Sequence, residues 1–311
     1  MVNSRVGLSR SLFSLLISLS LLVASVSGYP TASSPSLLED SDLLERDNHK
    51  PFKLKVWPVG ASITWGQHSQ SGNGYRKPLR DELVSDGWDV DMVGTKKNGN
   101  MTDNNVEGYP GYTIAKVQTA AIEALPHLPD KPNVVLINAG TNDCRLNLDI
   151  TKAGDRMQQM IEAILKEKTM EKATIILSTL IPSNQQEIKA NRDAVNEQYR
   201  KLVTTMSKKG TSIRLAEMEK ALTWPADYTV DGKADDTHPS DAGYAKMAKV
   251  WFEAIKDAYH DGVIKGITTT VKSPPGETVT EVITVESAVV VGPDVEVEVE
   301  VVTETITVSE A

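Results

Sequence analysis

The stretch Leu54-Lys55-Val56-Trp57-Pro58-Val59-Gly60-Ala61-Ser62 contains the first apolar run after the amino-terminal region of the chain. Leu54–Val59 is short and almost entirely apolar, which predicts a strand buried on both faces. A glycine, an alanine and a serine follow at once, so Ser62 lies at the end of the predicted strand. A hydroxyl group at this place is a candidate for chemistry.

Further apolar runs alternate with amphipathic segments along the next part of the chain. The predicted strands are Leu54–Val59, Trp88–Val93, Asn133–Ala139, Ala173–Leu180 and Ser212–Ala216. The predicted helices are Tyr75–Asp86, Ile114–Leu125, Ala153–Lys168, Glu187–Lys208 and Asp241–Ala258. This alternation predicts an α/β domain in which five parallel strands carry helices on both faces. Ligands of such sheets lie beyond the carboxyl ends of the strands.

Three further polar residues complete a set with Ser62. Asn142 follows the third predicted strand, within Gly140-Thr141-Asn142-Asp143, and Asp235 precedes His238 by three residues. A serine hydroxyl needs a base to remove its proton, histidine is the usual base, and a carboxylate orients the histidine. Each pattern is weak alone, but their order and placement together predict a serine acyl hydrolase with Ser62, His238 and Asp235 as its catalytic residues.

A tetrahedral intermediate also needs hydrogen-bond donors for its oxyanion. The candidates are the backbone N–H groups of Ser62 and Gly111 and the side-chain amide of Asn142. Other interpretations stay open at this point: Gly111 can serve turn geometry alone, Asn142 can be a loop or helix-cap residue, and His238 can simply flank a helix before Pro239.

The chain resembles the SGNH hydrolase superfamily, also called GDSL esterases, from about Lys55 to Tyr259. Within it the chain is most similar to carbohydrate esterase family 3, the acetyl xylan esterase group. The shared motifs are Gly74-Tyr75-Arg76, Val93-Gly94-Thr95, Glu107-Gly108-Tyr109-Pro110-Gly111, Gly140-Thr141-Asn142-Asp143 and His238-Pro239-Ser240-Asp241-Ala242-Gly243-Tyr244. The resemblance implies a flavodoxin-like three-layer α/β/α sandwich and assigns Ser62, Gly111, Asn142, Asp235 and His238 to the family's site. One residue departs from the pattern: Ala61 stands where the family usually has aspartate.

The resemblance implies a secreted serine esterase that hydrolyses acetyl esters on plant cell-wall polysaccharide such as acetylated xylan, without a metal or organic cofactor. Two alternatives stay open, a lipid or general short-chain esterase and a catalytically impaired carbohydrate-binding relative. Trp65 and Trp224 can stack on sugar rings or be partly buried. Arg76 can touch substrate, but a structural role is favoured, and Asp143 is expected to form loop hydrogen bonds.

The chain divides into four predicted zones, the third of which is the catalytic domain. They are a signal peptide at 1–28, a flexible leader at 29–51, the catalytic domain at 52–262 and an acidic tail at 263–311 that is disordered or weakly β. Arg5 and Arg10 before the apolar stretch 12–26 are typical of a signal peptide; a transmembrane anchor is the alternative. No later segment is expected to cross a membrane.

Charge and cysteine content restrict the possible partners. The net charge is −9, and the residues from Thr268 onward, with nine acids and one lysine, carry −8 of it. No basic face for nucleic acid is therefore expected, and we expect a monomer. Cys144 is the only cysteine, which excludes an intrachain disulfide and favours a buried apolar role. Asn100-Met101-Thr102 is a glycosylation sequon.

Overall fold

The computed structural model describes residue 50 and residues 52–266. The predicted signal peptide, most of the predicted leader and the tail from residue 267 lie outside the described residues. Val263 and Ile264 stand at the start of the predicted tail, but Ile264 is buried in the core and the Val263 carbonyl accepts a hydrogen bond from Thr174. The packed domain therefore continues past residue 262.

All five predicted strands are present and run parallel to one another. They are β2 (Val90–Met92), β1 (Leu54–Gly60), β5 (Val134–Asn138), β6 (Thr174–Ser178) and β7 (Ile213–Ala216), in that spatial order. The second strand of the chain lies outside the first, and the other three follow on the opposite side. This is the flavodoxin-like strand order.

The sheet has more strands than the five that the sequence predicted. β4 (Asn105–Gly108) pairs in parallel with the carboxyl end of β1, and β3 (Lys96–Lys97) pairs antiparallel with β4. The sheet of the described residues is therefore a mixed sheet of seven strands. β8 (Thr229–Val230) and β9 (Lys233–Ala234) form a separate two-stranded hairpin. These four strands are too short and polar to give an apolar run.

The five predicted helices also form. They are α2 (Arg76–Ser85), α3 (Ile114–Ala124), α5 (Ala153–Lys166), α6 (Gln186–Lys208) and α7 (Asp241–His260). Elements shorter than two turns were not predicted, because they are too short to show a helical period. These are α1 (Ser62–Trp65), α4 (Thr141–Arg145) and the 3₁₀ turns η2 (Leu125–His127), η3 (Ile150–Lys152) and η4 (Ala226–Tyr228).

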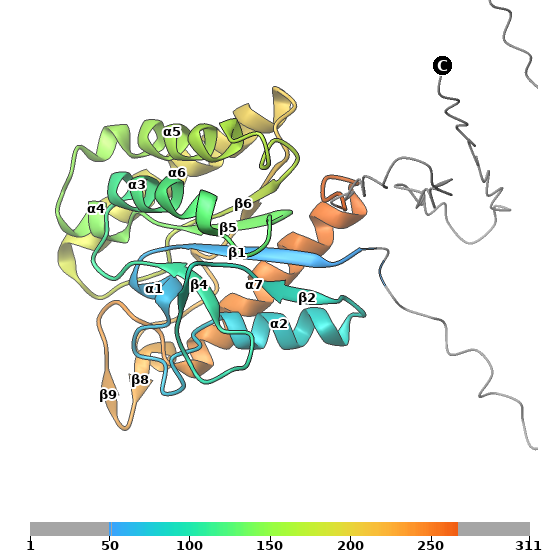
Figure 1. Cartoon of the computed structure of the whole chain (residues 1–311). Coiled ribbons are helices and arrows are strands. Elements are labelled where there is room, and N and C mark those ends of the chain that lie inside the picture. Colours follow the sequence, from blue (N-terminus) through green and yellow to red (C-terminus); the bar gives the residue numbers. More distant parts are fainter. Residues whose placement is uncertain (1–49, 51, 267–311) are drawn as a thin grey trace, which may run out of the picture. The chain divides into compact units, whose positions relative to one another are not determined.

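The domain has three layers, with α3, α5 and α6 on one face of the sheet and α2 and α7 on the other (Figure 1). β5 shows why its sequence is continuously apolar. Val135 and Ile137 point into the core shared with α3, α5 and α6, whereas Val134 and Leu136 point into the core shared with α2 and α7. A strand covered on both faces needs apolar residues at every position. The three-layer α/β/α sandwich is confirmed.

The parallel strands place their carboxyl ends at one edge of the sheet. Gly60, the last residue of β1, pairs with Asn138, the last residue of β5. A Cβ atom at Gly60 would lie 2.2 Å from the Asn138 carbonyl oxygen, so only glycine permits this close approach. The segments that carry Ser62 and Asn142 therefore start beside each other.

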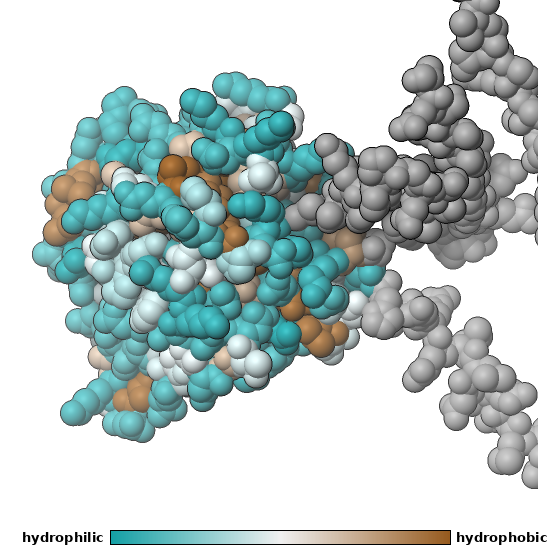
Figure 2. Space-filling view, in the orientation of Figure 1, coloured by the Kyte–Doolittle hydropathy of each residue, from teal (hydrophilic) through white to brown (hydrophobic). Residues whose placement is uncertain are grey.

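The surface of the domain is mainly hydrophilic. On the face shown in Figure 2, hydrophobic residues form small separate patches among polar ones. The large hydrophobic side chains that are exposed in the described residues are Val84, Tyr112, Leu146, Leu148 and Trp224. Within the same residues, no helix combines the length and the apolar character that a membrane span requires.

Candidate active site

Ser62 is the first residue of α1, a helix of a single turn directly after β1. Gly66 ends the turn with a left-handed φ of 91°, and its N–H donates back to the carbonyl oxygens of Ser62 and Ile63. The Ser62 side chain is largely enclosed, at 8% exposure. The end of the strand and the short turn thus fix the direction of the hydroxyl group.

Arg76 supports the far end of this turn. It is fully buried, and its guanidinium donates to the carbonyl oxygens of four residues: Trp65, Gly72, Asn98 and Asn104. Burial lowers the pKa of this guanidinium from its ordinary value. The Trp65 carbonyl also accepts a 2.6 Å hydrogen bond from Asn98. Arg76 therefore has the structural role that the sequence favoured. It helps to order the turn Ser62–Trp65, which in this chain follows Ala61 and not an aspartate.

His238 lies against Ser62, although the two residues are 176 positions apart. Its Nε2 atom is 3.0 Å from the Ser62 Oγ atom. The Nδ1 atom of the same ring is 3.1 Å from the Asp235 Oδ1 atom. Since the carboxylate accepts a hydrogen from Nδ1, Nε2 is left as the acceptor for the serine hydroxyl. The three side chains form one continuous hydrogen-bonded relay.

The Asp235-x-x-His238 spacing produces a turn that closes on the carboxylate. Besides the ring of His238, Asp235 Oδ1 accepts the backbone N–H groups of Thr237 and His238, each at 2.7 Å. Burial alone would raise the pKa of Asp235, but these N–H donors and the charge of His238 outweigh it, so that this pKa lies below its ordinary value. Asp235 is therefore a stable anion beside the imidazole.

The pKa of His238 is lowered from its ordinary value of 6.5, chiefly by burial of the ring. The carboxylate of Asp235 opposes the shift, whereas the neighbouring side chains of His68 and Arg145 add to it. His238 is consequently neutral, and able to accept a proton, down to a lower pH than an exposed histidine.

Asn142 lies in α4, just beyond the end of β5, and its side chain is almost buried. Its Nδ2 group donates a 2.9 Å hydrogen bond to the carbonyl oxygen of Tyr112. The helix cap is Gly140, with a φ of 120°, so Asn142 does not occupy the cap position. A side-chain amide has two hydrogens, and the bond to Tyr112 uses one of them.

Gly111 lies in the turn Tyr109-Pro110-Gly111-Tyr112 that follows β4. The Tyr112 N–H donates to the Tyr109 carbonyl oxygen at 3.1 Å, and Gly111 has a φ of 82°. Proline at the second position and a left-handed glycine at the third are typical of a type II turn. Asn142 is bonded to the same turn, so the structure brings this pair together. Ser62, Gly111 and Asn142 stay predicted oxyanion donors.

Asp143 and Cys144 are buried residues of α4 that directly follow Asn142 and support the fold. Asp143 is buried, accepts the Ile114 N–H at the start of α3 at 2.9 Å, and lies 3.3 Å from Arg156. Burial raises its pKa, and the bond from Ile114 and the charge of Arg156 oppose that rise. Burial and the neighbouring Asp143 raise the pKa of Cys144 to about 12. Both residues agree with the structural roles that the sequence favoured.

The two candidate sugar-stacking tryptophans differ in exposure. Trp65 is half-buried, and its backbone is so close to β4 that a Cβ atom on Gly108 would lie 2.7 Å from the Trp65 nitrogen. Trp224 is 38% exposed, and its Nε1 atom donates to the Asp235 carbonyl oxygen at 3.2 Å. Trp224 is thus the better placed of the two to meet a substrate.

Residues that the sequence did not single out also reach the site. Ser183 and Asn184 follow β6 and bind the backbone of Asp236, between the two catalytic candidates. The available signal was a polar pair in the loop after a buried strand, five and six residues beyond the end of β6. His68, at a φ of 69°, lies 3.1 Å from the Tyr228 carbonyl oxygen through its Nε2 atom. In the described part of the chain, no group of three or more His, Cys, Asp or Glu side chains could hold a metal ion.

The chain is similar to known esterases in sequence. Residues 59–246, more than half of the chain, match the GDSL-like Lipase/Acylhydrolase family. A multidomain esterase of Ruminococcus flavefaciens is 26% identical over 227 residues, which cover 65% of this chain and 28% of that protein. The chain thus spans less than a third of this curated relative.

Solved structures of similar fold include a family 3 carbohydrate esterase of Clostridium thermocellum, with a TM-score of 0.58 and 24% identity over 66% of this chain and 96% of that one. A family 3 carbohydrate esterase from Talaromyces cellulolyticus has a TM-score of 0.52 and 20% identity, covering 67% of this chain and 99% of that one. At these identities the similarity supports the fold alone. The family match carries the assignment: the chain belongs to the GDSL-like lipase/acylhydrolase family.

Proposed function

We propose that the protein is a secreted serine esterase that removes acetyl groups from plant cell-wall polysaccharide such as acetylated xylan. The observation that carries the catalytic part is the hydrogen-bonded relay from Ser62 through His238 to Asp235, with contacts of 3.0 and 3.1 Å. Such a relay turns a weakly nucleophilic hydroxyl into an attacking group.

In the first half of the proposed reaction, Ser62 Oγ attacks the ester carbonyl while His238 Nε2 takes the hydroxyl proton. The Asp235 carboxylate stabilises the resulting imidazolium. Negative charge on the tetrahedral oxygen is met by the N–H groups of Ser62 and Gly111 and by the second amide hydrogen of Asn142. His238 then protonates the leaving alcohol, and an acyl-enzyme forms at Ser62.

In the second half, water replaces the alcohol. Neutral His238 takes a proton from that water, and the hydroxide attacks the acyl carbon under the same donors. Collapse of the second tetrahedral intermediate releases the carboxylic acid and returns the proton to Ser62. Both halves use the same residues, since His238 acts first as a base and then as an acid in each.

The proposed substrate class is supported by motifs and by the surface beside the relay. The chain resembles carbohydrate esterase family 3 in its motifs, and two of the similar structures are carbohydrate esterases of that family. Tyr112 and Trp224 are each more than one third exposed, and each shares a hydrogen bond with a site residue, Asn142 or Asp235. An exposed aromatic ring offers a flat apolar face, which suits the apolar face of a sugar ring.

Secretion, glycosylation and a monomeric state belong to the same proposal. The basic and apolar amino-terminal segment supports secretion, and Asn100 of the sequon is exposed. Detection of the protein in culture medium, without residues 1–28 and with a glycan on Asn100, tests the first two. The mass of the protein in solution tests the third.

The catalytic part is tested with a small acetyl ester on the wild type and on Ser62→Ala. We expect a loss of turnover on the order of 10³-fold or more, because the triad residues act as a unit. The matched control is Ser207→Ala, which removes an exposed hydroxyl from α6 and should leave turnover unchanged. Glycan binding without any turnover by the wild type would instead identify a non-catalytic carbohydrate-binding protein.

The substrate class is tested separately. Acetylated xylan and a series of esters with longer acyl chains are compared by kcat/KM. We expect acetyl release from xylan and a steep fall in kcat/KM with acyl length. A preference for long acyl chains would support a lipid esterase on the same scaffold.

A further inference from the structure

The five residues between Leu180 and α6 form a loop. This loop binds the backbone of residues 235–238, the catalytic segment that contains Asp235 and His238. Ser183 is buried, and its Oγ atom donates to the carbonyl oxygen of Asp236 at 2.6 Å. The N–H of Asn184 donates to the same oxygen at 2.7 Å. The side chain of Asn184 also donates to Asp236 Oδ1 at 2.9 Å. One peptide carbonyl, located between Asp235 and His238, thus accepts two short hydrogen bonds.

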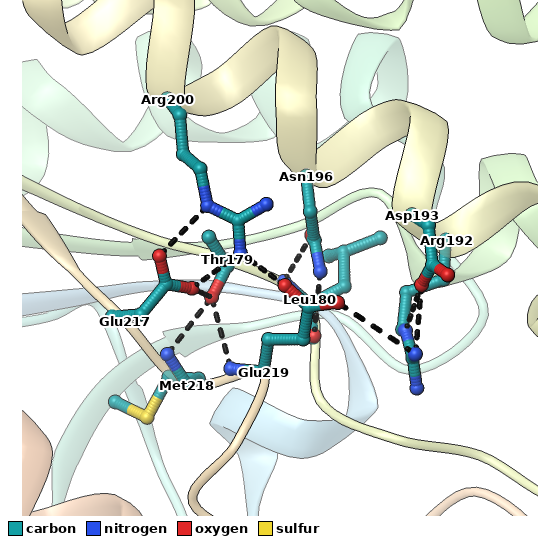
Figure 3. A network of polar contacts seen from close by, with 9 residues as sticks. All are labelled: Thr179, Leu180, Arg192, Asp193, Asn196, Arg200, Glu217, Met218 and Glu219. Carbon is teal, nitrogen blue, oxygen red and sulfur yellow. Dashed lines mark hydrogen bonds and ion pairs between the residues drawn. The ribbon is translucent and has the colours of Figure 1, made fainter.

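Thr179 and Leu180, the two residues just before this loop, are held by a polar network that involves α6 and the segment after β7 (Figure 3). Leu180 exchanges two hydrogen bonds with the buried side chain of Asn196 in α6, at 2.7 and 3.1 Å. Thr179 Oγ1 donates to Glu217 and accepts the N–H groups of Met218 and Glu219.

Arg200 completes the network by binding both glutamates, with two contacts of 2.8 Å to Glu217. The carboxyl ends of β6 and β7 and the helix α6 are thereby joined. Thr179 and Leu180, just before the loop, cannot shift without breaking buried hydrogen bonds to Asn196 and Met218, which are costly to leave unpaired.

The catalytic segment is also held at its own start. The N–H of Asp235 donates to the Tyr228 carbonyl oxygen at 3.0 Å, and the hydroxyl of Tyr228 donates to the carbonyl oxygen of Pro182 in the same loop. Tyr228 therefore links Pro182 of the loop to Asp235, the first residue of the catalytic segment. The Asp235 N–H belongs to the peptide just before the carboxylate, and the Asp236 carbonyl belongs to the peptide whose N–H, that of Thr237, donates to Asp235 Oδ1.

We propose that Ser183 and Asn184 are positioning residues of the esterase reaction, and that they act on Asp235 and His238 through the carbonyl group of Asp236. The inference rests on the proposed function. Neither residue touches the reacting atoms; they restrict the peptide between Asp236 and Thr237, whose N–H donates to the Asp235 carboxylate. A small displacement of catalytic groups can cost up to about 10²-fold in rate.

The first test compares Ser183→Ala, Ser183→Thr and Asp236→Ala in the full-length protein on a small acetyl ester. Ser183→Ala should lower kcat roughly 10-fold with KM unchanged, since the Asn184 N–H still holds the carbonyl. Ser183→Thr keeps the hydroxyl and should restore most of the rate. Asp236→Ala keeps the carbonyl and removes only the bond from the Asn184 side chain, so it should lower kcat less than Ser183→Ala does. A wild-type rate in Ser183→Ala, or an equal loss in Asp236→Ala, overturns the proposal.

The decisive test is a double-mutant cycle between Ser183→Ala and Asp235→Asn. If Ser183 acts through the acid–base pair, its removal should cost little once Asp235 is already an amide. Fully additive losses overturn the proposal, even if Ser183→Ala lowers the melting temperature. The outcome is separable from the esterase assignment, because that assignment fails if the wild type shows no turnover or if Ser62→Ala keeps its activity.

A pH profile adds a readout that a merely structural role would not move. The groups that act on the charge of His238 are Asp235, His68 and Arg145. Only Asp235 favours the charged ring, so a loosened contact in Ser183→Ala should shift the acid limb of kcat/KM to lower pH. An acid limb that stays in place, with a lowered melting temperature, would indicate stability alone and overturn the positioning role.

Discussion

The side chain of Asn142 donates a 2.9 Å hydrogen bond to the carbonyl oxygen of Tyr112. This contact joins the segment after β5 to the turn after β4, which also contains Gly111. Two of the predicted oxyanion donors are therefore parts of one hydrogen-bonded unit at the edge of the sheet. A donor that is already oriented costs no reorganisation when charge develops on the substrate.

Replacing Asn142 should therefore affect the rate more than the stability. We expect Asn142→Ala to lower kcat roughly 10²- to 10³-fold. The measurement is kcat and KM on a small acetyl ester, together with the melting temperature. An unchanged kcat would remove Asn142 from the oxyanion site.

Asn133 provides the matched control, because it is a buried asparagine just before the amino end of the same strand, β5. It accepts the Lys55 N–H at 2.8 Å and donates to the Lys53 carbonyl oxygen at 2.9 Å. Asn133→Ala should destabilise the fold by about 1–3 kcal/mol and leave kcat unchanged. Asn142→Ala should thus lower kcat more than stability, whereas Asn133→Ala should lower stability and leave kcat unchanged.

Gly111 and Gly210 form a second matched pair. Both have a left-handed φ, 82° and 90°, and in the described residues no neighbouring atom lies within 4 Å of where a Cβ atom would be. Alanine should therefore cost each position a similar backbone penalty of about 1–2 kcal/mol. Gly210 follows α6, away from the site.

Only Gly111→Ala should also lower kcat. Alanine disfavours the left-handed φ of Gly111, so the backbone there should rotate and turn away the N–H that is predicted to face the oxyanion. Denaturant unfolding and steady-state kinetics of both variants check this. If Gly111→Ala loses stability but keeps the wild-type kcat, the glycine serves the turn alone.

The sequence predicted the central strands because they are covered on both faces. Val134–Asn138 is buried throughout, so its continuous apolar run was a reliable signal. β3 (Lys96–Lys97) and β4 (Asn105–Gly108) gave no such signal. Both strands are short and contain polar residues, and they form because a neighbouring strand offers hydrogen-bond partners. Such strands depend on tertiary contacts that a local pattern does not contain.

The residues of the site differ in how clearly the sequence marks them. Ser62 and Asn142 were selected because each follows a buried strand directly, and the structure brings Ser62 together with His238 and Asp235. Ser183 also follows a buried strand, but it binds a peptide carbonyl. Every residue has a peptide carbonyl, so no residue type marks such a partner in the sequence.

Cys144 should be inert in the folded protein. Its side chain is fully buried, and its pKa is raised to about 12. The thiol therefore stays protonated near neutral pH, whereas the thiolate is the reactive form. A thiol reagent should therefore label the native protein very slowly and leave activity intact. Unfolded protein should give one thiol per chain, and rapid stoichiometric labelling of native enzyme would contradict the assigned burial.

The acid limb of activity should report the environment of His238. Its pKa is lowered from 6.5, and the base must be neutral to accept the Ser62 proton. kcat/KM should therefore stay high as the pH falls to 6.5 and decline only below it, as His238 becomes protonated. A limb centred at or above pH 6.5 would contradict this assignment. The measurement is the pH dependence of kcat/KM, which reports groups of the free enzyme.

Asp235→Asn tests the sign of this argument. Asp235 is the group that raises the pKa of His238, whereas burial, His68 and Arg145 lower it. Removing the carboxylate should therefore move the acid limb further toward low pH, while kcat falls on the order of 10³-fold or more because the imidazolium loses its partner. Asp236→Asn, which neutralises the adjacent exposed carboxylate, is the control and should leave the acid limb in place. A shift of the limb toward higher pH in Asp235→Asn would mean that Asp235 does not stabilise the charged ring, and the hydrogen-bonded relay would then not describe the working enzyme.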